Sequence, residues 1–136
     1  MLFRSRRKFE QNGWRLTSPL QMSVDYWLYR DYIQRSKGEF TVAKDQYVRL
    51  DTGWFSDRSA CYLAAGRPVI TQETGFTKNY GAKEGLLPFR TLDEVADAVK
   101  RIDADYAKHS RAARDVAREV FEAEKVLQSV LDRSSI

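Results

Sequence analysis

Apolar residues recur at three- and four-residue steps in three stretches of the chain, which is the spacing of one face of an amphipathic helix. The first stretch is residues 22–35, with Ser23 and Asp25 near its start as capping residues. The second opens with a capping box at residues 91–94 and continues to Ile102. The third, residues 106–131, predicts either one long helix or two shorter ones.

Between these stretches, short apolar runs rich in β-branched and aromatic residues are typical of buried strands. Because helices and short strands alternate along the chain, the predicted fold class is α/β, with a short parallel sheet flanked by helices in three layers. The strands are predicted at residues 39–43, 68–71 and 85–89, with a fourth candidate at 13–17.

A further helix is predicted between the first two strands. It begins at Ser56 or Asp57, both of which are good N-cap residues, and runs through Ala65. Gly66 then supplies the C-terminal turn, because glycine adopts the left-handed conformation that commonly ends a helix.

The two connections on either side of this helix have weaker patterns. Residues 44–55 show no clear period, and residues 47–50 predict either a helical turn or a short strand. The loop at residues 72–83 has two glycines and no apolar periodicity. We therefore expect that loop to lie on the surface and to be mobile.

The length of 136 residues fits a single domain, residues 1–136, with one core. The one cysteine, Cys61, excludes an internal disulfide, and the one histidine, His109, leaves a multi-histidine zinc site without ligands. We interpret Cys61 as a small buried apolar residue rather than a nucleophile. His109 is interpreted as a packing or capping residue rather than a catalyst.

The formal net charge is +4, which suits a phosphorylated ligand or an anionic membrane surface and gives no basis for a nucleic-acid partner. No apolar run is long enough to cross a bilayer, and no signal-peptide pattern follows the basic start, so we expect a soluble cytoplasmic protein without a transmembrane segment. Residues 1–11 are interpreted as a flexible, solvated basic end, with a binding patch as the alternative.

The most informative stretch is residues 52–70, where a Gly- and Ser-containing loop opens a helix and a strand follows. The first amides of a helix lack intrahelical partners and the helix dipole adds positive charge, so a phosphate is the natural ligand. Gly53 permits close backbone approach, Arg58 offers a bidentate fork and Lys44 adds a point charge. Loops after parallel strands converge at one edge of a sheet. The candidate diphosphate- and donor-binding residues are Lys44, Gly53, Trp54, Phe55, Ser56, Asp57, Arg58, Ser59, Glu73, Thr74 and Gly75.

The same loop has a purely structural interpretation. Residues 53–59 then form an ordinary capped helix start, with an ion pair between Asp57 and Arg58 or a neighbour. Trp54 and Phe55 either stack on a base or sugar, or pack as core and staple residues. The spacing alone does not decide between the two interpretations.

This stretch resembles the C-terminal, donor-binding half of GT-B glycosyltransferases, where a Gly-rich turn and helix precede a small-Gly-Lys/Arg-Pro-Val-Ile strand entry, here residues 65–70. Further landmarks resemble one bacterial branch of that family, and the resemblance covers roughly residues 12–131. They are Tyr29-Arg30-Asp31-Tyr32-Ile33, Ser36-Lys37-Gly38-Glu39-Phe40 with Ala43-Lys44, Thr74-Gly75-Phe76 and Gly85-Leu86-Leu87-Pro88-Phe89.

The resemblance implies a Rossmann-like sheet and a nucleoside-diphosphate sugar as substrate, with no cofactor or metal. Many retaining members of the family carry two glutamates with seven residues between them around this helix. The matching positions here are Gly53 and Cys61, so no catalytic residue is assigned. Glu73 is the remaining carboxylate placed to meet a sugar hydroxyl, with a solvated surface acid as the alternative.

The donor-binding half of such an enzyme normally has about five or six parallel strands, and the resemblance begins partway into it. We therefore expect the C-terminal part of a longer enzyme, whose acceptor-binding half is a missing partner, and no transferase activity from this chain alone. An open sheet edge predicts a homodimer or larger assembly, with residues 2–16 packed across that side. The alternative function is a non-catalytic nucleotide-binding or protein-interaction module of the same fold.

Overall fold

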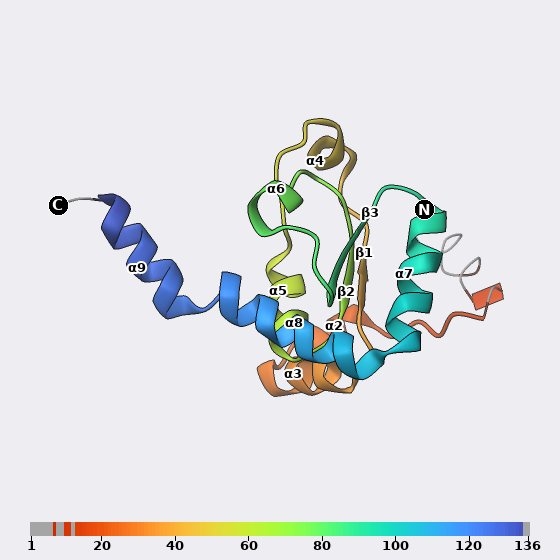
Figure 1. Cartoon of the computed structure of the whole chain (residues 1–136). Coiled ribbons are helices and arrows are strands. Elements are labelled where there is room, and N and C mark those ends of the chain that lie inside the picture. Colours follow the sequence, from red (N-terminus) through yellow and green to blue (C-terminus); the bar gives the residue numbers. More distant parts are fainter. Residues whose placement is uncertain (1–6, 8–9, 12, 135–136) are drawn as a thin grey trace. The chain divides into compact units, whose positions relative to one another are not determined.

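The computed structural model describes residues 7, 10, 11 and 13–134 (Figure 1). The chain divides into two compact units, residues 1–32 and 33–136, and each is described by itself. Most of the basic segment predicted at residues 1–11 lies outside the described residues.

The N-terminal unit contains α2 (Pro19–Ser23) and most of α3 (Tyr26–Arg35). The sequence predicts one helix over 22–35, whereas the structure breaks it before Tyr26, and the Asp25 carboxylate accepts a hydrogen bond from the Leu28 amide at 2.9 Å. The cap predicted at Asp25 is therefore confirmed, whereas Ser23 is the last residue of α2. The strand predicted at 13–17 is wrong, because residues 14–18, which the structure describes, have no regular secondary structure.

The second unit is built on a parallel sheet of β1 (Glu39–Thr41), β2 (Val69–Gln72) and β3 (Leu86–Phe89), in the order β1-β2-β3 within the described residues. The three predicted strands are confirmed: β1 and β3 are slightly shorter than predicted, and β2 is shifted by one residue. The register places Phe40 beside Ile70 and Ile70 beside Leu87, so these side chains share one face. The α/β class with a short parallel sheet is therefore confirmed.

Three helices lie in the connections between the strands: α4 (Asp45–Arg49) and α5 (Asp57–Ala64) between β1 and β2, and α6 (Thr77–Tyr80) between β2 and β3. The ambiguous residues 47–50 lie mostly in α4, which decides for a helical turn. The mobile surface loop predicted at 72–83 is wrong for its first half, because residues 73–76 are buried. Gly66, with φ at 70°, ends α5 as predicted.

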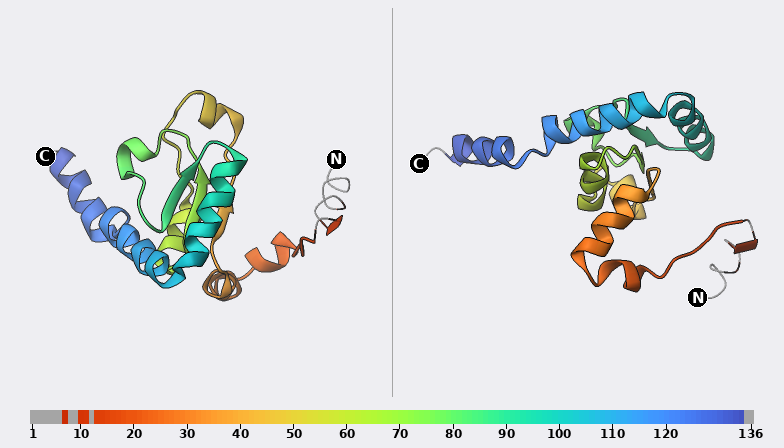
Figure 2. Two further views of the ribbon diagram at one scale, coloured as in Figure 1. Left: turned by 45° about the vertical axis from the view of Figure 1, so that its right-hand side comes forward. Right: turned by 90° about the horizontal axis from the view of Figure 1, so that it is seen from below.

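The remaining helices are α7 (Leu92–Ala104), α8 (Tyr106–Val120) and α9 (Ala123–Ser134). The predicted capping box is confirmed, since the Thr91 hydroxyl accepts from the Glu94 amide and the Glu94 carboxylate accepts from the Thr91 amide. The stretch 106–131 forms two helices rather than one. None of the described residues of α9 is buried, and Figure 2 shows α9 leading away from the sheet.

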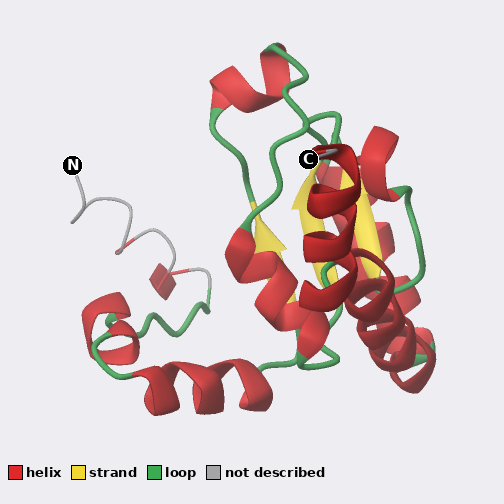
Figure 3. Ribbon diagram, turned by 90° about the vertical axis from the view of Figure 1, so that its left-hand side faces the viewer, coloured by secondary structure: helices red, strands yellow, loops and turns green. Residues whose placement is uncertain are grey.

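The core consists of two layers of side chains, one on each face of the sheet, and helices lie on both faces (Figure 3). On one face, strand residues pack against α7 in a cluster of Ile70, Leu87, Phe89, Ala98 and Ile102. On the other face, α5 packs against β2 and α8, and Leu63 of α5 is fully buried. This arrangement leaves the carboxyl ends of β1 and β2 to the loops that follow them.

Candidate anion-binding site

The loops that follow β1 and β2 are joined by hydrogen bonds at the carboxyl edge of the sheet. The Gly53 amide donates to the Thr74 carbonyl at 2.7 Å, and the Thr74 hydroxyl donates to the Trp54 carbonyl at 2.5 Å. The Gln72 amide oxygen accepts from the Ala43 amide at 3.1 Å, which joins the end of β2 to the end of β1. The predicted convergence of these loops is therefore confirmed.

Two glycines make this close approach of loops feasible. Gly53 and Gly75 have φ values of 75° and 91°, in the left-handed region that favours glycine. A Cβ atom on Gly75 would lie 2.4 Å from a carboxylate oxygen of Asp51. Glycine at position 75 therefore lets the loop after β2 pass against the loop that leads to α5.

The N-terminus of α5 is at this edge. Ser56 holds the N-cap position but its side chain makes no capping hydrogen bond to the described residues, and the Asp57 carboxylate accepts from the Arg58 amide at 2.8 Å. The helix dipole adds partial positive charge there. Of the predicted residues, Lys44, Asp57 and Arg58 are exposed, Gly53, Trp54 and Phe55 are half-buried, and Ser56, Ser59, Glu73, Thr74 and Gly75 are buried.

Arg58 is held by two polar residues of β1. Its Nε atom lies 2.5 Å from Oε1 of Glu39, whose side chain is 5% exposed, and its Nη2 atom donates to the Thr41 hydroxyl at 3.0 Å. The Thr41 hydroxyl in turn donates to the same Glu39 oxygen at 2.8 Å. The guanidinium therefore compensates a buried carboxylate, while half of the Arg58 side chain stays exposed.

This geometry differs from both sequence interpretations of Arg58. The alternative of an ion pair with Asp57 is replaced by a pair with Glu39, 19 positions earlier in the chain. The Arg58 guanidinium, which was predicted to bind a diphosphate, instead donates from its Nε atom to the Glu39 carboxylate. Any contribution of Arg58 to anion binding therefore comes from a side chain that is about half exposed and already bound to β1 through its Nε and Nη2 atoms.

Glu73 is buried, so its interpretation as a solvated surface acid is wrong. One of its carboxylate oxygens accepts from the Gly75 amide at 2.6 Å. This contact fixes the turn that follows β2, because it ties the side chain to the backbone two residues later.

The two aromatic residues of the loop have different roles. Phe55 packs among other rings, with centroid distances of 5.3–5.6 Å in a cluster with Phe76, Tyr80 and Phe121, so it is a core residue. Trp54 stacks on Tyr47 of α4, with the ring centroids 5.0 Å apart and the planes 9° from parallel. Trp54 as a whole is half-buried.

The sequence interpretations of Cys61 and His109, neither of which was assigned a catalytic role, have opposite outcomes. Cys61 is exposed, so its interpretation as a buried apolar residue is wrong: the inward face of α5 carries Ser59, Tyr62 and Leu63 instead. His109 is buried and its Nδ1 accepts from the Gly85 amide at 3.1 Å, which confirms a packing role.

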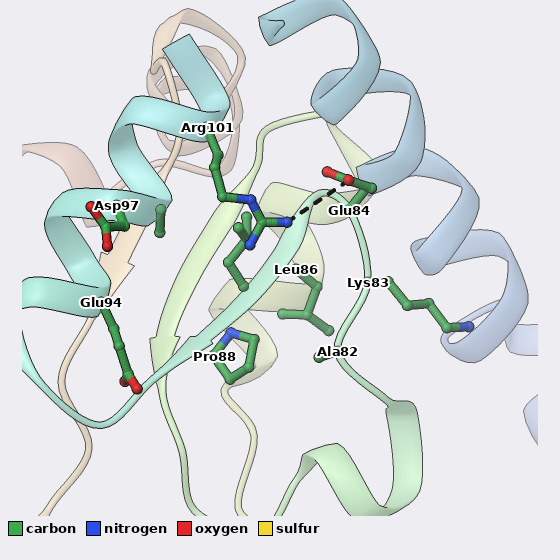
Figure 4. A pocket seen from close by; sticks show the side chains of 10 residues that line it. Ala82, Lys83, Glu84, Leu86, Pro88, Glu94, Asp97 and Arg101 are labelled. Atoms are coloured by element: carbon green, nitrogen blue, oxygen red, sulfur yellow. Dashed lines mark ion pairs between the residues drawn. The ribbon is translucent and has the colours of Figure 1, made fainter. Parts of the chain in front are cut away.

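Away from this edge, a hollow of about 500 Å³ lies beside β3 and α7 (Figure 4). Its charged side chains are already engaged within the protein. Glu84 lies near Arg101 and Lys108, Lys83 pairs with Glu119, and Asp97 pairs with Lys100. We therefore assign the candidate site to the carboxyl edge of the sheet rather than to this hollow.

Glu84 provides a pH-dependent contribution to stability. A hydrogen bond from Lys108 to the Glu84 carboxylate holds the pKa of this carboxyl below its ordinary value of 4.5, and the charges of Lys108 and Arg101 act in the same direction. Because the folded-state pKa is lowered, the stabilisation is complete above pH 4.5 and is lost as the pH falls through the lower value.

We expect Glu84→Gln to lower the free energy of unfolding at pH 7 by about 0.5–1 kcal/mol, since the side chain is partly exposed. The difference from wild type should shrink below pH 4.5. Urea denaturation between pH 3 and pH 7 measures this difference in the free energy of unfolding. The control is Asp115→Asn, on the exposed side of α8. A difference independent of pH would contradict the assignment.

The sequence analysis missed three residues that organise the site: Glu39, Thr41 and Gln72. Glu39 and Thr41 are two positions apart in a predicted strand, so they lie on the same face. A pair of polar residues on a buried face signals a need for a partner, and this signal was present in the sequence. No comparable signal identifies Gln72.

Comparison of the chain with family models, with curated proteins and with solved structures finds no match. In the part of the chain that the structure describes, no helix combines the length and apolar character needed to span a bilayer. The described residues also contain no group of three or more acidic, His or Cys side chains placed to hold a metal ion.

Proposed function

We propose that residues 33–136 form the donor-binding portion of a GT-B glycosyltransferase, which binds a nucleoside-diphosphate sugar at the carboxyl edge of the sheet. The observation that carries the proposal is the junction of the loops after β1 and β2 at the N-terminus of α5. The order of the sequence landmarks supports it. In parallel sheets, ligands bind where such loops and helix N-termini gather.

The diphosphate would be bound by the first amides of α5 and by two cations. Lys44 is exposed at the start of α4, immediately after β1, and about half of the Arg58 side chain is exposed at the first turn of α5. The half-buried Trp54, whose ring is supported from behind by Tyr47, offers a flat apolar surface for the base or the sugar. Asp57 opposes anion binding, which favours moderate rather than tight affinity.

A second candidate function is nucleotide binding without transfer. It is favoured by Gly53 and Cys61, which occupy the two positions where many retaining family members have glutamates. Glu73, the carboxylate that the sequence analysis placed to meet a sugar hydroxyl, is buried and accepts a hydrogen bond from the Gly75 amide. A transfer assay with a separately supplied acceptor-binding half distinguishes the two functions, since binding is common to both.

We expect the chain to bind UDP, ADP or GDP in calorimetric titrations, with the Lys44→Ala variant about tenfold weaker because one charge-assisted phosphate contact is lost. Lys44 is the better probe than Arg58, because its replacement does not leave Glu39 without a cation. The wild-type affinity should fall as salt is added, and the Lys44→Ala variant should show a shallower salt dependence.

The matched control is Lys100→Ala, which removes another exposed lysine, from α7, on the face of the sheet opposite to α5. It should leave the affinity within twofold of wild type. No binding of any nucleoside diphosphate at millimolar concentration would contradict the proposed function. Equal losses in the two variants would place the ligand elsewhere.

A further inference from the structure

The excess positive charge of the protein is confined to its first quarter. Residues 1–35 contain seven basic and three acidic residues, whereas residues 36–136 contain sixteen of each. The formal charge of +4 therefore belongs to residues 1–35, which we call the N-terminal basic segment, and the rest of the chain is neutral. A localised charge of this kind attracts an anionic surface.

The same segment exposes several large apolar side chains within a stretch of fifteen positions, residues 14–28. Leu20 and Val24 are 75% and 76% exposed, although both are aliphatic. Isolated exposed apolar residues are common, but this density in a short stretch marks an interaction surface. The exposed residues include Trp14, Leu20, Val24, Tyr26, Trp27 and Leu28.

Aromatic and basic groups are interleaved in this stretch. The Arg30 guanidinium lies 5.5 Å from the centroid of the Trp27 ring, and the Tyr26 and Trp27 rings meet edge to face at 5.0 Å. Tryptophan and tyrosine are enriched at membrane–water interfaces, because their rings suit the headgroup region and carry one polar atom. Arginine binds phosphate well in the same region.

We propose that the N-terminal basic segment binds the surface of an anionic lipid bilayer and lies in its interface. The aliphatic side chains of Leu20 and Val24 enter the apolar boundary, the rings of Trp14 and Trp27 lie at headgroup level, and the basic residues contact lipid phosphates. This inference concerns the first 35 residues and does not depend on the proposed nucleotide site.

Two other partners fit these observations less well. A single-stranded nucleic acid would use the basic and aromatic residues, but stacking gives no role to exposed Leu20 and Val24. A second copy of the segment would bury the apolar residues, but two segments of charge +4 repel each other. Of these three partners, an anionic bilayer is the one that satisfies the charge and the aliphatic surface together.

The test is co-sedimentation of the full chain with vesicles of phosphatidylcholine that contain phosphatidylserine, compared with phosphatidylcholine alone. We expect binding to the anionic vesicles, a blue shift of tryptophan emission, and loss of most binding in high salt. Each basic residue close to the surface contributes about fivefold to the partition coefficient. Equal binding to both kinds of vesicle would contradict the electrostatic part of the proposal.

Two matched pairs of variants locate the contact. Replacing Arg4, Arg6, Arg7 and Lys8 by Gln should weaken binding roughly a hundredfold or more, whereas replacing Lys100, Arg111, Arg118 and Arg133 by Gln removes the same net charge with a smaller effect. Leu20→Ser with Val24→Ser should weaken binding about tenfold or more. Leu127 and Val130 on α9 are also exposed, and the matched variant Leu127→Ser with Val130→Ser should not weaken binding.

Three outcomes overturn the proposal. The first is no binding to anionic vesicles at low salt. The second is equal loss in both quadruple variants, which would make net charge the cause rather than its position. The third is saturable binding of single-stranded oligonucleotides, or concentration-dependent self-association abolished by the Leu20 and Val24 replacements, in the absence of vesicle binding.

Discussion

Gly85→Ala is expected to lower the free energy of unfolding by more than about 3 kcal/mol. Gly85 has φ at 83°, and a Cβ atom added there would lie 2.5 Å from the Ala113 backbone nitrogen and 2.8 Å from the His109 carbonyl oxygen. Because these are backbone atoms of α8, a rotamer change cannot remove the clash. Either α8 or the start of β3 must shift.

Such a shift also breaks specific contacts. The Gly85 amide donates to His109, and the Gly85 carbonyl accepts from the Val69 amide at 2.9 Å. Gly85 therefore joins β2, β3 and α8 at one point, and displacement of its backbone affects the sheet and a covering helix together.

The matched control is Gly81→Ala. Gly81 has φ at 72°, but an added Cβ would meet only the Lys83 side chain at 3.8 Å. This variant carries the conformational cost of a non-glycine residue at positive φ, about 1–2 kcal/mol, without the clash. The two free energies of unfolding, measured by urea denaturation, should differ by at least about 1 kcal/mol. Equal losses would mean that α8 does not pack against Gly85 as described.

The sheet and most helices were predictable because their signals are local. The capping box at Thr91 and the glycine after α5 act over three or four residues, so the sequence contains the whole interaction. The strands are marked by apolar, β-branched runs that a parallel sheet buries on both faces. In the structure, strands that follow one another in the chain are neighbours in the sheet, in the order β1-β2-β3.

The errors occur where distant contacts override local pattern. The sequence of residues 73–76 is typical of a surface loop, but Thr74 is buried. It is hydrogen-bonded to Gly53 and Trp54, about twenty positions earlier in the chain. Cys61 has the small apolar character of a core residue, yet the helix turns it outward. Neither outcome is encoded within a few residues of the position concerned.

The candidate site was predictable in its position and not in its charge pairing. The convergence of loops after parallel strands is a property of the fold class, so it could be inferred once the strands were assigned. The partner of Arg58 depends on which strand residue faces α5, which the register of β1 and β2 determines. That register is a three-dimensional property of the sheet.

Arg58→Ala is expected to lower the free energy of unfolding by about 2–4 kcal/mol. The Glu39 side chain is 5% exposed and its Oε2 atom already lacks a hydrogen-bond partner among the described residues. Removal of the guanidinium leaves the carboxylate with the Thr41 hydroxyl as its remaining partner at 2.8 Å. The lower part of the range allows for water that enters beside the half-exposed Arg58 position.

The control is Arg111→Ala, which removes an exposed arginine from α8 and should change the free energy of unfolding by less than about 0.5 kcal/mol.

A double-mutant cycle then isolates the interaction between Glu39 and Arg58. Glu39→Gln alone removes the carboxylate charge and leaves Arg58 accessible to water, so it should be the milder variant. In the double variant Glu39→Gln with Arg58→Ala, the buried charge is absent, and the loss should be smaller than the sum of the two single losses by about 1–3 kcal/mol. Additive losses would show that Arg58 does not compensate the charge of Glu39.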